Sequence, residues 1–197
     1  IALPLIASII SGLFGKFIGD RNSEIVTSLL VSISAILSAV VLYEVIFNNY
    51  QDNIIIATWI NSGTLDVNWS MKIDPLSAIM LVVVTFVSSL VHIYSIGYMS
   101  HDPHKPRFMA YLSLFTFAML MLVTSDNFIQ LFFGWEGVGL CSYFLIGFWF
   151  KKDSANTAAI KAFVVNRVGD FGFALGIFLI FYLFGTVNYS EVFELIP

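Results

Sequence analysis

Glu136 places a carboxylate inside an apolar run that is long enough to cross a bilayer, NFIQLFFGWEGVGLCSYFLIGFWF at residues 127–150. Its position, about nine residues into the run, corresponds to about 13 Å along a helix, near the middle of a hydrocarbon layer about 30 Å thick. An ionisable group at that depth costs roughly 2.5–3.5 kcal/mol, and membrane proteins place such groups on proton and ion pathways. Glu136 therefore predicts proton uptake and release within the membrane. A purely structural acid, hydrogen-bonded to a neighbouring helix, is the alternative.

A second group of polar residues lies in KAFVVNRVGDFGFALG at residues 161–176. Asn166 and Arg167 precede Asp170 by four and three residues, so a helix brings all three onto one face. One interpretation is a self-contained ion pair between Arg167 and Asp170 that fixes helix packing. The other is a switchable pair, in which a proton arriving on Asp170 frees Arg167 to alter the charge on Glu136.

His92 belongs to a third polar stripe. Its hydroxyl-bearing neighbours at helical spacing are Thr85, Ser88, Ser89 and Ser95. Imidazole titrates near neutral pH, and polar side chains inside a helix bundle can line a wetted path. His92 is therefore a candidate for a proton path from the inner surface. A buried histidine, satisfied by hydrogen bonds between helices, is the alternative.

The elements that must position these residues are membrane-spanning helices. Hydrophobic residues make up 58% of the 197 residues, charged residues make up 11%, and 20 residues are Phe, a composition outside the usual range of soluble domains. Six apolar segments approach or exceed the roughly 17 to 25 residues that a spanning helix needs. They lie at residues 1–18, 25–47, 75–99, 108–124, 127–150 and 158–184. The predicted fold class is all-α, a polytopic transmembrane bundle of about six spanning helices.

The connections between these segments predict the orientation of the chain. Basic residues flank the odd-numbered connections, whereas the even-numbered connections contain only Lys72. The flanking residues are Lys16, Arg21, Lys105, Arg107, Lys151 and Lys152. The positive-inside rule therefore places the odd-numbered connections on the cytoplasmic or matrix side and the N-terminus outside. The long second connection, residues 48–74, carries β-favouring residues around Trp59 and Trp69, and we expect either a short hairpin or an interfacial segment there.

Several classes of site have no motif in the sequence. Neither a Cys/His cluster nor a GxGxxG or P-loop motif occurs, so no metal, nucleotide, flavin or iron–sulfur site is predicted in this chain. No basic patch indicates nucleic acid as a partner, and the expected surroundings are the lipid bilayer. The single cysteine, Cys141, lies inside an apolar segment, where we expect packing rather than a disulfide.

Four stretches of the sequence resemble a known family: HIYSIGYM at 92–99, PRFMAYLSLFTFAMLMLV at 106–123, DNFIQLFFGWEGVGLCSYFLIGFWF at 126–150 and AAIKAFVVNRVGDFGFALGIF at 158–178. They are similar to the largest antiporter-like membrane subunit of respiratory NADH:quinone oxidoreductase (complex I), which is subunit L in bacteria and chain 5 in mitochondria. GWEGVGLCSY combined with NRVGD is the specific part of the pattern. The resemblance runs through essentially the whole chain.

The resemblance implies a subunit that translocates protons while other subunits carry electrons. Glu136 matches the essential glutamate of the family, and Asp170 and Arg167 match its NRVGD aspartate and arginine. The implied partners are other antiporter-like membrane-arm subunits and the subunits that hold NADH, FMN, iron–sulfur clusters and quinone. No cofactor is expected in this chain.

Family members contain two inverted repeats of five helices each. Residues 1–107 are therefore expected to form three N-terminal helices with an outer loop at 48–74, and residues 108–197 the first part of a repeat. Because the family is much longer, and its lysines on the seventh and eighth helices have no counterpart before Pro197, we expect an N-terminal portion with an incomplete inverted-repeat fold.

Two other functions remain open at this point. The chain could be the large subunit of a multisubunit Na⁺/H⁺ antiporter, which shares the same ancestry and needs no NADH-linked chemistry. It could also be a non-transporting scaffold, in which the buried charges serve packing. The wording of the sequence favours a bacterial plasma membrane, with the mitochondrial inner membrane as the alternative.

Overall fold

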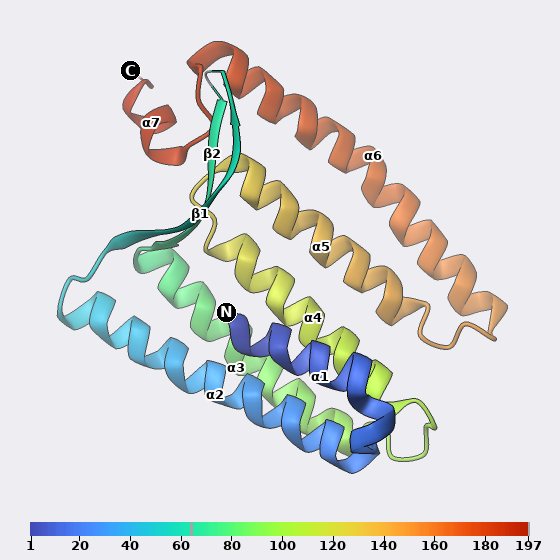
Figure 1. Ribbon diagram of the computed structural model, residues 1–197. Helices are drawn as coiled ribbons and strands as arrows, with labels where there is room; N and C mark the ends of the chain where they lie inside the picture. Colours follow the sequence, from blue (N-terminus) through green and yellow to red (C-terminus); the bar gives the residue numbers. More distant parts are fainter. Residues whose placement is uncertain (64, 197) are drawn as a thin grey trace.

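The computed structural model describes residues 1–63 and 65–196, which form a helix bundle with a β-hairpin at one end (Figure 1). The helices are α1 (Ala2–Ile18), α2 (Asp20–Phe47), α3 (Pro75–Tyr98), α4 (Lys105–Val123), α5 (Phe128–Ile146), α6 (Asp153–Phe184) and α7 (Tyr189–Glu194), and the strands are β1 (Asp52–Ser62) and β2 (Leu65–Ile73). Helices α2 to α6 are long and apolar enough to cross a membrane, and α1 is a shorter apolar helix of 17 residues. The predicted transmembrane helix bundle is confirmed, and the chain is a multi-pass membrane protein; of the six spanning helices predicted, five reach the length of a span in the described residues and α1 is shorter.

Some boundaries differ from the prediction. Helix α6 begins at Asp153 rather than at residue 158, with an acidic side chain in its first turn where the helix dipole favours negative charge. Helix α5 ends at Ile146, so residues 147–152 form the connection to α6. Two predicted ranges include positions outside the described residues: the outer loop at 48–74 includes position 64, and the predicted repeat at 108–197 ends at position 197.

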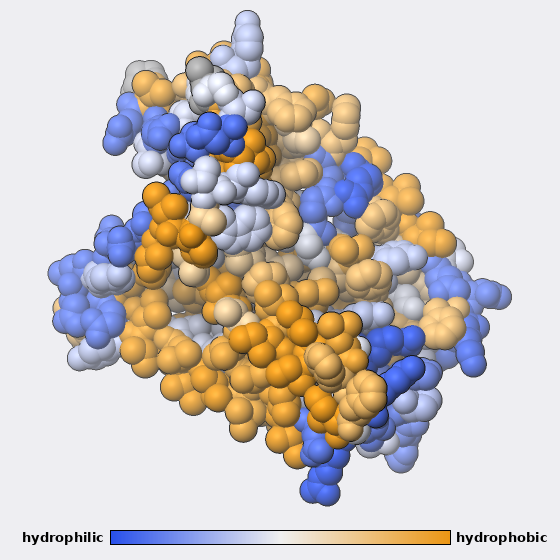
Figure 2. Space-filling view, in the orientation of Figure 1, coloured by the Kyte–Doolittle hydropathy of each residue, from blue (hydrophilic) through white to orange (hydrophobic). Residues whose placement is uncertain are grey.

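The bundle buries small polar side chains and exposes large apolar ones. In α2 the buried residues include Ser23, Thr27, Ser34 and Ser38, whereas Ile36 is 65% exposed. Small side chains allow helix backbones to approach closely, which is the usual packing of membrane helices. Apolar side chains dominate the face shown over α1 and α2, and hydrophilic residues gather toward the ends of the bundle (Figure 2). This distribution suits lipid around the helices and water at their ends.

Helix α4 lies at the centre of the arrangement. It packs against α1, α2, α3 and α5, while α6 packs against α5 on the far side (Figure 1). Helices α4 and α5 approach each other closely, because a Cβ added at Gly134 of α5 would lie 2.7 Å from the Cα of Leu122 in α4. The sequence therefore positions α5 between a central helix and α6.

The second connection forms the hairpin, which confirms one of the two predicted possibilities. Strands β1 and β2 pair antiparallel, with Asp52 opposite Ile73 and Asn61 opposite Asp66, and the register is irregular between Thr58 and Ile60. Strand β1 is almost entirely exposed, whereas β2 has buried residues at Val67 and Ser70. Strand β2 is thus the strand that faces the rest of the protein.

The hairpin is attached to the first turn of α5. The Gln130 side chain accepts a hydrogen bond from the Ser70 backbone N–H at 2.9 Å and donates one to the Ser70 carbonyl at 2.7 Å, as a neighbouring strand would. Asn127 caps α5 by accepting from the Gln130 N–H at 2.8 Å and donates to the Asn68 carbonyl at 2.9 Å. Val67 also packs with Ile177 of α6, so the hairpin contacts both α5 and α6.

The odd-numbered connections gather at the opposite end of the bundle. Ser11 of α1 donates a hydrogen bond to the Pro106 carbonyl at 2.8 Å, and Arg107 donates one to the Phe148 carbonyl at 3.0 Å. The first connection is only Gly19, whose φ of 85° is in the region that favours glycine. The predicted basic residues of these connections therefore share one end of the molecule, opposite the hairpin.

Candidate functional site

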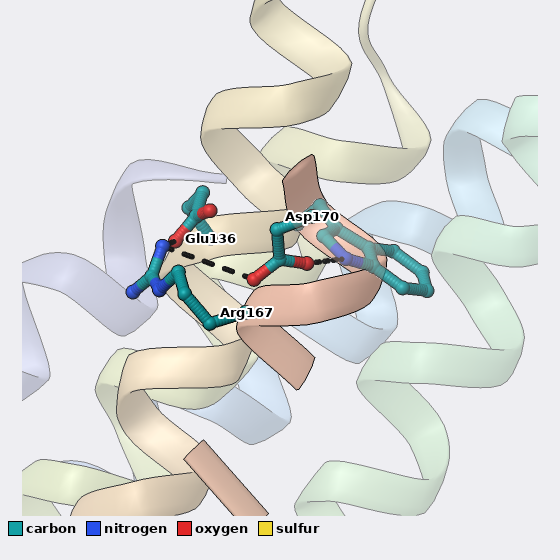
Figure 3. A network of polar contacts seen from close by, with 4 residues as sticks. Glu136, Arg167 and Asp170 are labelled. Carbon is teal, nitrogen blue, oxygen red and sulfur yellow. Dashed lines mark hydrogen bonds and ion pairs between the residues drawn. The ribbon is translucent and has the colours of Figure 1, made fainter. Parts of the chain in front are cut away.

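Glu136 lies on the side of α5 that faces α6. Its Oε2 accepts a hydrogen bond from Nη1 of Arg167, and the two side chains form an ion pair between the helices (Figure 3). The Glu136 side chain is 23% exposed and that of Arg167 is 49% exposed. Helices α5 and α6 therefore supply the carboxylate and its cation.

Asp170 lies near the same guanidinium nitrogen that Glu136 contacts. Its Oδ2 is 3.8 Å from Nη1 of Arg167, one turn away in α6, and its side chain is 9% exposed (Figure 3). Arg167 is thus shared between two carboxylates and does not form a self-contained pair with Asp170. We refer to Glu136, Arg167 and Asp170 as the charge triad.

Two aromatic side chains contact the charge triad, and neither was predicted from the sequence. The Trp135 indole N–H donates a hydrogen bond to Oδ1 of Asp170 at 2.8 Å. The Phe163 ring lies under the Arg167 guanidinium, with its centroid 4.6 Å from the Arg167 carbon Cζ, in a cation–π contact. The sequence feature that could have indicated Trp135 is its position directly before Glu136. A tryptophan beside an intramembrane acid carries an N–H donor that can reach a polar group on the neighbouring helix.

Three glycines of α6, at positions 169, 172 and 176, form a stripe of small residues near the charge triad. A Cβ added at Gly169, Gly172 or Gly176 would meet nothing within 4 Å in the described chain. The neighbouring Val168 is 75% exposed. In the described residues the close helix contacts of α5 are made instead at Gly134 and at Gly137, where an added Cβ would lie 3.1 Å from that of Ala118 in α4. The stripe therefore leaves one face of α6 open.

His92 is fully buried between α3 and α4. Its Nδ1 lies 2.7 Å from the Ser88 carbonyl oxygen. Because a carbonyl oxygen can only accept a hydrogen bond, Nδ1 carries the proton of the neutral ring. The other nitrogen, Nε2, then accepts a hydrogen bond from the Ser113 hydroxyl at 3.0 Å. The Ser88 hydroxyl is 2.5 Å from the Thr116 hydroxyl of α4. The imidazole thus has a partner at each nitrogen.

The four predicted site residues fall into two separate places. Glu136, Arg167 and Asp170 come together between α5 and α6, whereas His92 lies in the contact between α3 and α4. Helix α4 packs between α3 and α5. The structure therefore does not bring His92 to the charge triad.

A further polar cluster lies at the hairpin end, in the connection between α4 and α5. The Asp126 carboxylate accepts a hydrogen bond from the Asn53 side chain of β1. Burial raises the pKa of Asp126 above its ordinary value of 3.8, and the Asn53 hydrogen bond and the charge of Lys72 partly oppose this rise. Burial also raises the pKa of the Tyr189 hydroxyl, which lies 3.1 Å from the Ser125 hydroxyl. Asp126 thus links the hairpin to the segment before α5, and Tyr189 links α7 to the same segment.

Metal ligation was not expected from the sequence. Within residues 1–63 and 65–196, no three His, Cys, Asp or Glu side chains cluster as ligands of an ion. Cys141 is free and buried within α5.

Comparison with known families gives matches over two parts of the chain. Residues 59–109 match the family described as NADH-Ubiquinone oxidoreductase (complex I), chain 5 N-terminus. Residues 125–196 match the family described as NADH:quinone oxidoreductase/Mrp antiporter, TM.

Individual relatives match over nearly the whole chain. NADH-ubiquinone oxidoreductase chain 5 of Triticum aestivum is 58% identical over 97% of the chain, and NADH-quinone oxidoreductase subunit L of Rickettsia bellii (strain RML369-C) is 52% identical over 100%. The matched regions are 28% and 31% of those proteins, so the chain spans less than a third of their length.

Two solved structures have a similar fold. A chain of the membrane-bound sulfane sulfur reductase, an archaeal respiratory membrane complex, has a TM-score of 0.85 and 20% identity over 99% of this chain and 39% of that one. A chain of the Mrp complex from Dietzia sp. DQ12-45-1b has a TM-score of 0.79 and 22% identity, over 97% of this chain and 20% of that one. At these identities the comparison describes the fold alone.

Proposed function

This chain belongs to the family of NADH-ubiquinone oxidoreductase chain 5 and NADH-quinone oxidoreductase subunit L, and we propose that it couples NADH oxidation and quinone reduction in other subunits to proton translocation across the membrane. The observation that carries the proposal is the position of Arg167 between two intramembrane carboxylates, Glu136 and Asp170. One cation shared by two acids on two helices is an element whose pairing can change with protonation.

In this mechanism Glu136 is the proton carrier. While Arg167 pairs with Glu136, the cation stabilises the ionised carboxylate and favours proton release. When Arg167 moves toward Asp170, Glu136 loses that stabilisation inside a low-dielectric environment and takes up a proton. The two acids are therefore coupled through one guanidinium, and a charge change imposed from outside the helix pair would alternate the two states.

Electron transfer belongs to other subunits in this proposal. NADH, FMN, iron–sulfur clusters and quinone would be held by partner subunits, and this chain would contribute no redox centre. Its neighbours would be other antiporter-like subunits of the membrane arm, in a bacterial plasma membrane or a mitochondrial inner membrane. Relatives of both origins support either location. The route from the inner surface through His92 stays a prediction.

The test is Glu136→Gln in the intact complex. We expect the complex to assemble, proton pumping and coupled quinone reduction to fall at least tenfold, and NADH oxidation by an artificial acceptor at the soluble arm to continue. The matched control is Glu44→Gln, an exposed acid near the hairpin end of α2 whose carboxylate is bonded to Asn48. Wild-type pumping in an assembled Glu136→Gln complex would exclude the proposal.

A multisubunit Na⁺/H⁺ antiporter is the second candidate. It is favoured by the shared family description over residues 125–196 and by the fold similarity to the Mrp complex. Sodium-dependent proton exchange in vesicles without NADH would support it, whereas NADH-dependent pumping that requires Glu136 supports the respiratory function. Loss of assembly in every charge variant would instead indicate a scaffold.

A further inference from the structure

Trp135 provides a neutral hydrogen-bond donor to a carboxylate that otherwise has only Arg167 as a charged neighbour in the triad. Its indole Nε1 is 2.8 Å from Oδ1 of Asp170, while the other carboxylate oxygen, Oδ2, is 3.8 Å from Arg167. The two donors therefore approach different oxygens of the same acid. The Trp135 ring also packs edge-on against Phe173 of α6, with 6.2 Å between centroids.

Trp135 and Glu136 are consecutive residues of α5, so their side chains leave the helix about 100° apart. Trp135 reaches Asp170, and Glu136 reaches Arg167 one turn earlier in α6. Adjacent residues of α5 thus contact two charged residues of α6, Arg167 and Asp170. The indole donor is rigid, whereas the guanidinium is at the end of a flexible side chain.

We infer that Trp135 is a positioning residue for the charge triad: its N–H occupies Asp170 and so leaves Arg167 available to Glu136. The inference rests on the proposed function. Two carboxylates compete for one guanidinium, and Asp170 is always within reach because it lies three residues along the same helix. A hydrogen bond from the neutral indole N–H stabilises the Asp170 anion without help from Arg167. The competition of the two acids for Arg167 is therefore shifted in favour of Glu136.

The experiment is the pH dependence of coupled quinone reduction in intact complexes carrying Trp135→Phe. The substitution keeps an aromatic ring and removes the N–H. Arg167 should then pair more with Asp170, and an acid that loses a neighbouring cation holds its proton to higher pH. We expect the pH profile to move toward alkaline pH by about one unit, which is a tenfold change in proton concentration. A change of this size corresponds to the energy of one hydrogen bond to a charged group.

The matched control is Trp149→Phe. Trp149 donates to Oδ2 of Asp102 at 2.9 Å, which is the same chemistry at the end of the bundle opposite the hairpin. We expect this variant to keep the wild-type profile. The rescue variant is Trp135→His, because the five-membered ring of histidine places Nε2 where that of tryptophan places Nε1, and we expect it to restore at least half of the shift.

The outcomes separate this inference from the proposed function when Glu136→Gln is measured alongside. If Glu136→Gln stops pumping while Trp135→Phe keeps the wild-type profile, only the positioning role is overturned. An equal shift in Trp149→Phe, or failure of both Trp135 variants to assemble, would also overturn it, since the side chain would then act through general packing. Full pumping in Glu136→Gln would exclude the proposed function itself.

Discussion

Arg167 approaches both acids through one guanidinium nitrogen, Nη1, which carries two N–H donors. The planar fork carries five N–H donors and cannot lose its charge at any physiological pH, so it can face two carboxylates from one position. Phe163 supports the flat face of the fork while leaving its edges free. A lysine has one compact ammonium group on a flexible stem and no flat face to stack.

Arg167→Lys should therefore weaken coupling while keeping the charge. We expect proton pumping to fall at least tenfold, since loss of one charge-assisted hydrogen bond is worth about 1.5–3 kcal/mol and a factor of ten corresponds to about 1.4 kcal/mol. Pumping by purified complexes in vesicles is the measurement. Arg21→Lys, in the first turn of α2, is the control that changes the same residue type away from the triad. Equal pumping in Arg167→Lys and Arg21→Lys would show that the fork geometry is unimportant.

The charge triad could be predicted from the sequence, but its geometry could not. Glu136, Arg167 and Asp170 are conspicuous because charged residues are rare in apolar segments, and helical spacing alone relates Arg167 to Asp170. Which acid Arg167 faces depends on how α5 and α6 pack, and local spacing carries no information about that. Trp135 was missed because tryptophan is an ordinary apolar residue in a membrane helix until a buried acceptor lies beside it.

At the scale of elements, the helices follow from apolar runs, whereas the hairpin depends on contacts made elsewhere. Residues 48–74 alternate β-favouring residues with polar ones, a pattern compatible with a hairpin or an interfacial segment. The hairpin is stabilised by Gln130, whose amide pairs with the Ser70 backbone as a strand would. A glutamine in the first turn of α5 gives no signal of that role, because its partner lies 60 residues earlier.

The Asp126 cluster predicts that attachment of the hairpin depends on pH. Burial raises the pKa of Asp126 in the folded protein, so the folded state binds this proton more tightly than the unfolded chain does. Its contribution to stability is complete below the ordinary value of 3.8 and is lost as pH rises through the higher folded value. Protection of the hairpin amides against hydrogen exchange, corrected for intrinsic rates, should therefore decrease as the pH rises above the ordinary value of 3.8.

Asp126→Asn should remove this pH dependence, because asparagine can still accept the hydrogen bond from Asn53 and carries no charge. The control is Asp66→Asn, an exposed acid on β2 that should leave the dependence in place. A pH dependence that survives in Asp126→Asn would assign it to another group of the cluster.

At the scale of the whole molecule, the distribution of charge predicts orientation. The basic connections share one end, and the hairpin, with Lys72, is at the other. The positive-inside rule places the basic end on the cytoplasmic or matrix side. A Cys141→Ser background permits a test with single cysteines at Lys152 and at Thr58. A membrane-impermeant thiol reagent added outside should label Thr58→Cys and leave Lys152→Cys unlabelled until the membrane is opened. The reverse labelling pattern would invert the assigned orientation.

Helix α5 is attached at both ends: Gln130 holds its first turn to the hairpin, and the carbonyl of Phe148, just beyond its last turn, accepts from Arg107 of α4. Glu136 lies between these two attachments, which restrict sliding or tilting of α5 as a whole. In the proposed function, Arg167 can therefore exchange between Glu136 and Asp170 by rotation about its side-chain bonds, without movement of α5. Such torsions take picoseconds to nanoseconds, whereas collective helix movements take microseconds to milliseconds. Under the proposed function, we therefore expect the exchange at Arg167 to be faster than any collective step, so that the slow step of the cycle involves movements beyond these two side chains.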